Sequence, residues 1–171
     1  MGFLALFLDE KARHPEAGGG AAATEATFGN VITRDERMFE VLALLRKVAP
    51  TDLTVQLRGE TGTGKGLLAY SLHALSRRAD RRFLAINCAA IPETLLESEL
   101  FGHVRGSFTG ADSDKKGLIA EAEGGTLFLD EVDTLTPSAQ IKLLRFLEDR
   151  TYRSLGASRP VRANVRLVAV T

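Results

Sequence analysis

Cysteine is scarce in this sequence, since Cys88 is the only one among 171 residues. A single thiol excludes an intramolecular disulfide and a metal site built from cysteines alone. Proteins without disulfides are typical of reducing compartments. The cysteine content therefore favours a cytoplasmic protein, and Cys88 itself is most simply interpreted as a small buried residue.

Net charge is absent as well, because 22 basic residues balance 22 acidic ones. Sequence-independent affinity for DNA comes from clustered Lys and Arg side chains that displace counterions from phosphates. The balance argues against an extended nucleic-acid surface, and we expect no direct DNA binding by this piece. The content of 44% hydrophobic and 26% charged residues is that of an ordinary globular protein, and the length predicts one domain.

Long hydrophobic runs are also missing. The apolar stretch at residues 3–8 is too short to span a bilayer, no basic residue precedes it, and Asp9 and Glu10 follow it. We therefore expect neither a signal peptide nor a membrane anchor.

Composition changes along the chain and suggests a division into two parts. Residues 1–14 allow a short helix, and residues 17–27 are almost entirely Gly, Ala and Thr, as in a linker. The sequence therefore predicts an N-terminal segment with a linker at residues 1–27 and a folded domain at residues 28–171.

Hydrophobic periodicity predicts alternating strands and helices in the folded domain. Leu53, Val55 and Leu57 alternate with polar residues, as in a half-buried strand, and a helical pattern later extends to about Arg78. Apolar runs predict further strands at residues 83–86, 126–130 and 165–170. Repeated strand and helix units imply an α/β fold, a three-layer sandwich with a mainly parallel sheet.

Two helices have recognisable start signals. The first is predicted to begin near a capping box formed by Thr33 and Glu36 and to end before Pro50. Its apolar face is expected at Met38, Val41, Leu42, Leu45 and Val48. The second is predicted over residues 137–149, with Thr136 before Pro137 at its start. Its apolar side is expected at Ile141, Leu144 and Leu147.

A glycine-rich segment lies between the first predicted strand and the helix that follows it. It reads Gly59-Glu60-Thr61-Gly62-Thr63-Gly64-Lys65, and Gly66 comes next. This is the glycine and lysine spacing of a Walker A loop, in the strand–loop–helix context that the motif requires. Inward backbone N–H groups, the positive end of a helix dipole and the Lys65 charge suit phosphates. The segment predicts an ATP site, and the alternative is a tight glycine turn with a solvated lysine.

An acidic pair, Asp130 and Glu131, closes the apolar strand at residues 126–130, which is the Walker B arrangement. Gly66 stands where most Walker A loops place the Ser or Thr that binds Mg²⁺, so the metal needs water or a carboxylate from elsewhere. Carboxyl ends of parallel strands face the ligand crevice. We therefore expect both carboxylates at the Mg²⁺ shell, with Glu131 also orienting and deprotonating the attacking water. The alternative is an acidic strand end without function.

Further motifs follow one another in order along the chain. They read Asn87-Cys88-Ala89-Ala90, Glu99-Leu100-Phe101-Gly102-His103, Gly106-Ser107-Phe108-Thr109-Gly110-Ala111 and Gly124-Gly125-Thr126-Leu127-Phe128-Leu129-Asp130-Glu131. Together with the Walker A loop they resemble the central domain of sigma-54-dependent activators, also called bacterial enhancer-binding proteins. The resemblance covers about residues 28–171. It implies a P-loop NTPase fold, the large subdomain of an AAA+ ATPase.

The resemblance also implies a function. It implies a homo-oligomeric ring that couples ATP hydrolysis to remodelling of the closed complex of sigma-54 RNA polymerase. Residues 106–111 match the family's hallmark loop, usually written GAFTGA, which touches the sigma factor. Ser107 replaces the usual Ala, whereas Phe108 and Thr109, the pair expected to make contact, match. Without the resemblance, this segment is equally well a glycine-bounded surface loop.

Some residue roles rest on the resemblance alone. Asn87 matches the family's switch residue, which restrains the catalytic glutamate, here Glu131, whereas by itself an Asn after a strand is more often a turn former. Gly66 is a second departure, since the family commonly has Glu there. The basic residues are expected to be solvated or to complement helix dipoles. They are Arg77, Arg78, Arg81, Arg82, Arg145, Arg150, Arg153, Arg159, Arg162 and Arg166.

The family continues past the last predicted strand with a sensor Asn, arginine fingers, a helical lid and often a helix-turn-helix. These 171 residues contain none of these parts, so we expect a piece of a longer protein or a shortened family member. Two functions stay open. One is a motor module that acts on sigma-54 polymerase, and the other is a nucleotide-binding regulatory or interaction module that no longer hydrolyses ATP.

Overall fold

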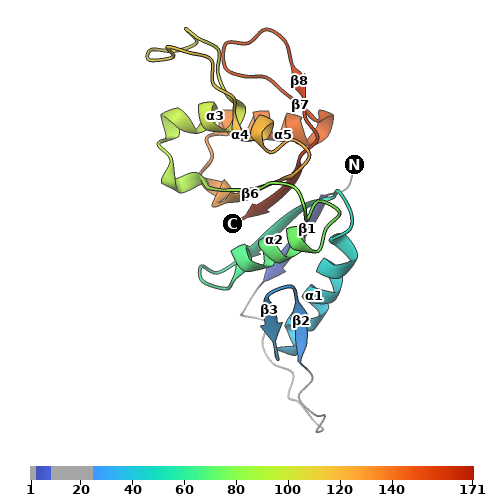
Figure 1. The fold of residues 1–171 in the computed structure, drawn as a ribbon. Coiled ribbons are helices and arrows are strands. Elements are labelled where there is room, and N and C mark those ends of the chain that lie inside the picture. Colours follow the sequence, from blue (N-terminus) through green and yellow to red (C-terminus); the bar gives the residue numbers. More distant parts are fainter. Residues whose placement is uncertain (1–2, 9–24) are drawn as a thin grey trace.

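The computed structural model describes residues 3–8 and 25–171 (Figure 1). At its centre is a five-stranded sheet in which all neighbouring strands run parallel. In spatial order the strands are β1 (Phe3–Leu8), β4 (Thr54–Gly59), β9 (Arg166–Val170), β6 (Thr126–Asp130) and β5 (Phe83–Asn87). Parallel neighbours need crossover connections, so the chain passes over the faces of the sheet between strands.

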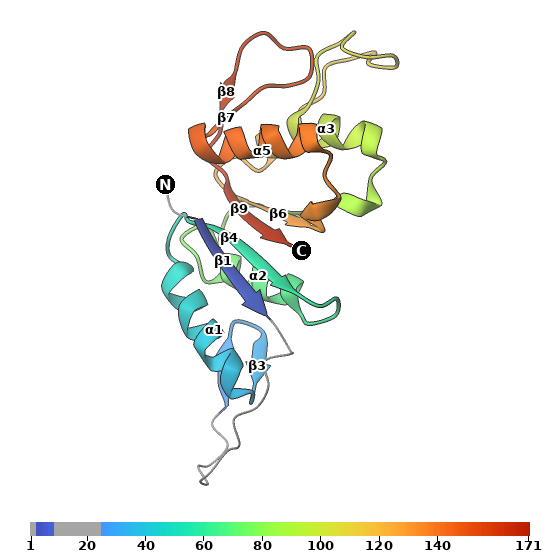
Figure 2. The ribbon, with the colours of Figure 1, turned by 180° about the vertical axis from the view of Figure 1, so that it is seen from behind.

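Helices cover both faces of this sheet (Figures 1 and 2). One face carries α1 (Glu36–Val48) and α2 (Lys65–Ala74), and the other carries α3 (Glu93–Phe101), α4 (Leu118–Glu121) and α5 (Pro137–Asp149). Phe128 and Val168 pack in the core that contains α1 and α2. Their neighbours Leu127 and Leu167 pack in the core that contains α3 and α5. The prediction of a three-layer α/β sandwich with a parallel sheet is confirmed.

Several predicted elements are present at the expected positions. β6 and α5 have the predicted bounds, and β4, β5 and β9 differ from them by one or two residues. The start of α5 follows from its sequence, because the Thr136 hydroxyl accepts a hydrogen bond from the Ala139 N–H at 3.1 Å and Pro137 occupies the first turn.

The start of α1 and the end of α2 differ from the prediction. α1 begins at Glu36 and is capped by Asp35, whose carboxylate accepts from the Arg37 N–H at 2.9 Å. The Thr33 hydroxyl instead accepts from the Asp35 N–H at 3.1 Å, so the capping box predicted for Thr33 is wrong. α2 ends at Ala74 and not near Arg78.

The predicted apolar side of α5 is wrong at Ile141 and Leu144, whereas Leu147 is half-buried and packs against the core. The buried residues of α5 are Ala139, Leu143 and Phe146, whereas Ile141 and Leu144 are each 55% exposed. Both sets have helical spacing, and only the position of the sheet decides which one is covered.

The N-terminal part differs most from expectation. Residues 3–8 form β1, so the helix predicted at 1–14 is wrong for them, and the rest of that range lies outside the described residues. Ala26 and Thr27 of the predicted linker belong to β2 (Ala26–Phe28), whereas the division at residues 27 and 28 stays a prediction. Within residues 3–8 and 25–171, no helix is both long and apolar enough to cross a bilayer.

Two hairpins were not predicted. β2 pairs antiparallel with β3 (Val31–Thr33), and β7 (Thr151–Tyr152) pairs antiparallel with β8 (Val161–Arg162). Their strands are only two or three residues long, too short for a periodicity to be recognised.

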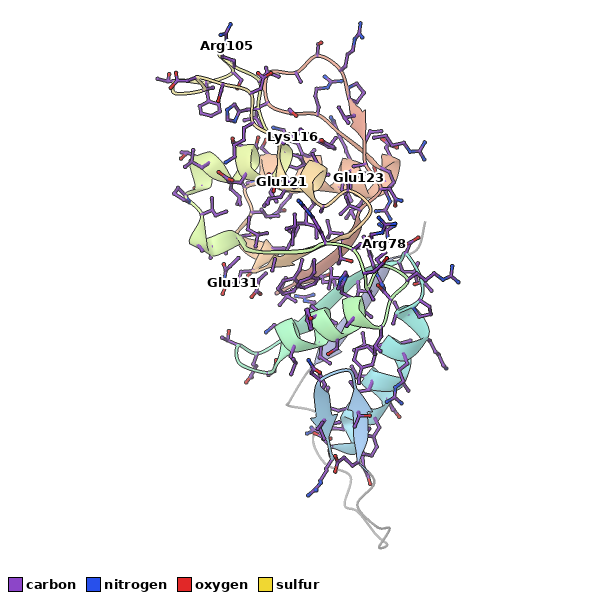
Figure 3. All side chains as sticks on the ribbon, in the orientation of Figure 1. Arg78, Arg105, Lys116, Glu121, Glu123 and Glu131 are labelled. Atoms are coloured by element: carbon purple, nitrogen blue, oxygen red, sulfur yellow. The ribbon has the colours of Figure 1, made fainter. Side chains whose placement is uncertain are left out.

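Arg78 and Arg166 are buried where the central strands begin, with exposed fractions of 9% and 1%. Arg78 contacts Asp52 through Nε at 2.8 Å, and its Nη1 donates to the carbonyls of Gly125 and Asn164 at 3.1 and 3.0 Å. These contacts join the starts of β4, β6 and β9. Figure 3 shows Arg78 on the opposite side of the molecule from Glu131.

Arg166 completes the end of α1. Its Nη1 donates to the Ala49 carbonyl at 2.7 Å and its Nη2 to the Val48 carbonyl at 3.0 Å. These carbonyls have no partner within the helix and carry the negative end of its dipole. Burial lowers the pKa of Arg166 to about 10, so the guanidinium remains charged near neutral pH. Its expected complementation of a dipole is observed, but in the interior and not in solvent.

We predict that Arg166→Met destabilises the domain by about 3 kcal/mol, because the buried Val48 and Ala49 carbonyls lose their hydrogen bonds to the guanidinium. Urea unfolding of the variant measures this loss. The control is Arg162→Met, an exposed position in β8, which should change the free energy of unfolding by less than about 0.5 kcal/mol. Equal unfolding midpoints for the two variants would show that Arg166 does not stabilise the sheet.

Candidate functional site

The carboxyl ends of the parallel strands meet at one edge of the sheet. Asn87 lies opposite Asp130 in the register of β5 and β6. The Gly59 N–H, at the end of β4, donates to the Thr171 carbonyl that follows β9 at 3.3 Å. The predicted phosphate loop, acidic pair and switch residue therefore emerge at the same edge, where open parallel sheets bind ligands.

The loop between β4 and α2 depends on its glycines. Gly62 and Gly64 have φ values of 86° and 81°, in the left-handed region that glycine adopts without cost. Thr63 closes the turn, since its N–H and its hydroxyl donate to the Glu60 carbonyl at 3.4 and 2.8 Å. α2 begins directly after this turn at Lys65. Its free N–H groups and the positive end of its dipole thus lie at the loop.

Lys65 folds back over the same loop. Its Nζ donates to the carbonyls of Gly59 and Glu60, each at 2.8 Å. The ammonium group therefore lies within the curve of the loop, where a bound phosphate would replace these neutral carbonyl acceptors with anionic oxygens.

Gly66 is the second residue of α2 and is exposed. A Cβ atom built there would have no neighbour within 4 Å. Space is therefore available for a larger side chain, and this chain supplies no metal ligand from that position.

The acidic pair lies at the end of β6, whose first four residues are buried, with Asp130 as the last strand residue and Glu131 directly after it. The Asp130 carboxylate accepts from the Glu131 N–H at 3.0 Å. In residues 3–8 and 25–171, no group of three or more His, Cys, Asp and Glu side chains is arranged to hold a metal ion. A Mg²⁺ ion at this edge would therefore need phosphate oxygens and water in addition to the pair.

Glu131 has an unusual backbone. Its φ and ψ are 53° and 48°, in the left-handed region, which costs a residue with a Cβ roughly 1 kcal/mol or more. Within the described part of the chain, Arg150 at the end of α5 is the other non-glycine residue with positive φ. Such strain clusters at functional sites. Figure 3 shows Glu131 on the same side of the molecule as the loop between β4 and α2.

The pKa of the Cys88 thiol is affected by the negative charges at this edge. Cys88 is buried, as expected, and burial followed by the charges of Asp130 and Glu131 raises the pKa of its thiol to about 11. The thiol therefore stays protonated at neutral pH, which argues against a nucleophilic role.

Asn87 acts as a local cap in this structure. Its side-chain oxygen accepts from the Ala89 N–H at 2.9 Å, at the start of the short 3₁₀ turn Cys88–Ala90. No hydrogen bond joins Asn87 to Glu131 within the described ranges. The turn-forming alternative is therefore what this conformation shows, and a switching role stays a prediction.

The predicted hallmark loop, residues 106–111, lies away from the phosphate loop (Figures 1 and 2). Its ends are joined, since the Gly106 N–H donates to the Ala111 carbonyl at 2.8 Å. Gly106 and Gly110 have positive φ values of 78° and 94°. Thr109 is exposed, whereas Phe108 is half-buried and lies 5.0 Å, between ring centroids, from His103. The structure thus does not bring this loop together with the carboxyl edge of the sheet, where the phosphate loop and the acidic pair lie.

Ser107, the residue that departs from the usual Ala, faces inward. Its hydroxyl oxygen is buried without a hydrogen-bond partner. A Cβ on Gly156 would come within 2.6 Å of the Ser107 Cβ, so the β7–β8 hairpin must have glycine where it meets the loop. Ser107 also contributes to a cavity of about 530 Å³ between α3, α5 and this hairpin. The cavity contains no residue of the phosphate loop or the acidic pair and is separate from that site.

The residues that hold the hallmark loop lie in a distant segment and were not predicted. The Val104 N–H donates to the Leu155 carbonyl at 3.0 Å, and the Leu155 N–H donates to the Gly102 carbonyl at 2.9 Å. The β7–β8 hairpin thus supports the base of the loop. The signal available was Gly156, but a lone glycine does not indicate its partner across 50 residues of chain.

Comparison with known proteins agrees with these features. Residues 31–171 match the family "Sigma-54 interaction domain". The chain is 48% identical over 146 residues to the Nif-specific regulatory protein of Azospirillum lipoferum, covering 85% of this chain and 23% of that protein. It is 49% identical over 141 residues to the transcriptional regulatory protein GlrR of Escherichia coli K12, covering 82% and 32%.

Among solved structures, NtrX from Brucella abortus in complex with ATP superposes with a TM-score of 0.73 at 33% identity. The match covers 83% of this chain and 30% of that one. The chain thus spans less than a third of the length of each of these three proteins. Because the family match extends over residues 31–171, the chain belongs to the family of sigma-54 interaction domains.

Proposed function

We propose that this domain binds ATP with Mg²⁺ at the carboxyl edge of its sheet. The observation that carries the proposal is the convergence of two left-handed backbone features on this edge, the glycines of the phosphate loop and the strained Glu131. Residues 59–66 would surround the phosphates with backbone N–H groups, and Lys65 would add its charge. The complex of NtrX with ATP supports the choice of nucleotide.

The acidic pair has two roles in this proposal. Bound Mg²⁺ would neutralise phosphate charge, with Asp130 and Glu131 contributing to its shell. Glu131 would orient the attacking water and accept its proton. Asn87 would restrain Glu131 by donating its amide N–H to the carboxylate once its side-chain oxygen no longer accepts from the Ala89 N–H.

The family supplies the proposed partner. We propose that Phe108 and Thr109, within residues 106–111, contact sigma-54, and that a homo-oligomeric ring couples ATP hydrolysis to remodelling of the sigma-54 RNA polymerase closed complex. A transcription regulator of this kind would act in the cytoplasm, and we propose that its DNA contact lies outside this piece. Gly66 favours one alternative, a nucleotide-binding regulatory module that no longer hydrolyses ATP, because no side chain extends from this position toward the metal.

We predict that Lys65→Ala weakens ATP binding about 10- to 100-fold, since a charge-assisted contact to phosphate is lost. Titration calorimetry measures the affinity. Lys116→Ala, an exposed lysine distant from the loop, is the control and should bind as the unchanged chain does. Equal affinities of the two variants would refute the phosphate assignment.

We predict slow ATP hydrolysis by the 171-residue chain alone. An arginine supplied by a neighbouring subunit typically contributes about 10³ to 10⁵ in rate, and the motifs identified here do not include one. Phosphate release assays should show turnover only in an assembled full-length protein, and Glu131→Gln should abolish it while ATP still binds. Rapid turnover by the 171-residue chain would refute this expectation. Failure of the assembled full-length protein to hydrolyse ATP would favour the regulatory module.

We predict that Thr109→Ala in a full-length protein abolishes binding to sigma-54 in the presence of a transition-state mimic of ATP, while ATP turnover stays near normal. The reason is that Thr109 is exposed on a loop separate from the nucleotide edge. Ser113→Ala, an exposed position just after the hallmark loop, is the control. Loss of turnover with binding intact would instead make residues 106–111 part of the catalytic scaffold.

A further inference from the structure

His103 lies at the base of the hallmark loop, and its backbone is fixed there. Its N–H donates to the Lys115 carbonyl at 3.0 Å, and its carbonyl accepts from the Lys115 N–H at 2.9 Å. These two bonds close the stem from which residues 104–114 project. The position of the His103 Cα therefore does not depend on the conformation of the loop.

The imidazole of His103 is fixed as well. The Ser98 hydroxyl lies 2.7 Å from His103 Nδ1, and Ser98 is a buried residue of α3 with an exposed fraction of 3%. A hydrogen bond to Nδ1 sets the rotation of the ring, because it selects one orientation about the Cβ–Cγ bond. α3 thus determines the direction of the imidazole.

Phe108 lies against this imidazole. The ring centroids are 5.0 Å apart and the ring planes make an angle of 71°, which is the favourable edge-to-face arrangement. Phe108 is half-buried, in a loop whose glycines allow other backbone conformations. An edge-to-face pair favours its contact geometry by about 2- to 12-fold over separated rings. This preference is large enough to populate one position of Phe108 and small enough for a partner to overcome.

We propose that His103 is the positioning residue of the hallmark loop. Ser98 orients the imidazole, the imidazole holds Phe108 against the stem, and Phe108 leaves this contact when it is presented to a partner. The identity of that partner as sigma-54 rests on the proposed function, whereas the position of Phe108 does not.

Fluorescence tests the position without any partner. The chain has no tryptophan, so Phe108→Trp introduces a single reporter in the loop. In this background, His103→Gln removes the ring, Ser98→Ala removes its orientation, and His103→Phe keeps a ring without the hydrogen bond. We expect acrylamide to quench the reporter about 2- to 12-fold faster in His103→Gln, with intermediate rates in the other two variants. Ser113→Ala is the control and should leave the rate unchanged.

A second test, nuclear magnetic resonance of the histidine rings, needs neither the Phe108→Trp reporter nor a substitution of His103. Phe108→Leu should shift the imidazole proton signals of His103, because they lose the ring current of Phe108. The signals of His73, which lies 5.1 Å from Phe83 and not near the loop, should stay in place. A graded order of quenching together with this shift supports the positioning role. Equal quenching in His103→Gln and its parent, or an unshifted His103 signal, overturns it.

A full-length protein separates this inference from the proposed function. If His103→Gln increases sigma-54 binding without nucleotide by up to about 12-fold, the proposed partner and the positioning role of His103 are both supported. If neither the parent nor any variant binds sigma-54 while quenching and the ring signal respond as expected, the proposed partner is wrong and the positioning role of His103 stands.

Discussion

The parallel register of the central strands is the constraint on which the rest of the structure depends. Because β4, β5, β6 and β9 run in the same direction, their carboxyl ends meet at one edge. The phosphate loop, Asn87 and the acidic pair are separated along the chain and are brought together only by this register. A slip of one residue between β5 and β6 would move Asp130 away from its place opposite Asn87 and reverse the face to which each strand residue points.

The opposite edge helps to fix this register. Arg78 joins the residues before β4, β6 and β9, and Arg166 ties the start of β9 to the end of α1. Neither guanidinium has a buried carboxylate as its main partner. Backbone carbonyls provide most of the acceptors, and carbonyls occur in every residue, so the sequence contains no sign of these contacts. This explains why both arginines were expected in solvent.

Prediction from sequence succeeded where the determining interactions are local. Thr136 and Pro137 start α5 by themselves, and the apolar residues of β6 lead directly into the acidic pair that begins with Asp130, so both elements have the predicted bounds. Prediction failed where contacts with a distant segment determine which residues are buried or which element forms. Ile141 and Leu144 are as apolar as Leu143 and Phe146, and the sheet alone determines which pair is buried. The strand β1 likewise exists through its pairing with β4.

The candidate site shows the same distinction. The phosphate loop was predicted from seven consecutive residues, whereas the left-handed backbone of Glu131 and the capping of Ala89 by Asn87 were not, since both depend on conformations that the residue types do not require. The hallmark loop was predicted by its glycines and by resemblance. Its support by Leu155 and its inward Ser107 were missed because both involve a hairpin about 50 residues further along the chain.

Chain connectivity provides a route by which the two separated sites would communicate. The hallmark loop is inserted in the crossover between β5, which ends at Asn87, and β6, which ends at Asp130. After Asn87 and the 3₁₀ turn Cys88–Ala90 comes α3, whose Leu96 and Leu100 pack in the same core as Leu127 of β6. Since a packed core transmits displacement with little compression, a shift at the ends of β5 and β6 would move α3 as a body. Ser98 lies on that helix, so the group that orients His103 would move with it. The contact that holds Phe108 is therefore placed where a change at the nucleotide edge is able to release it.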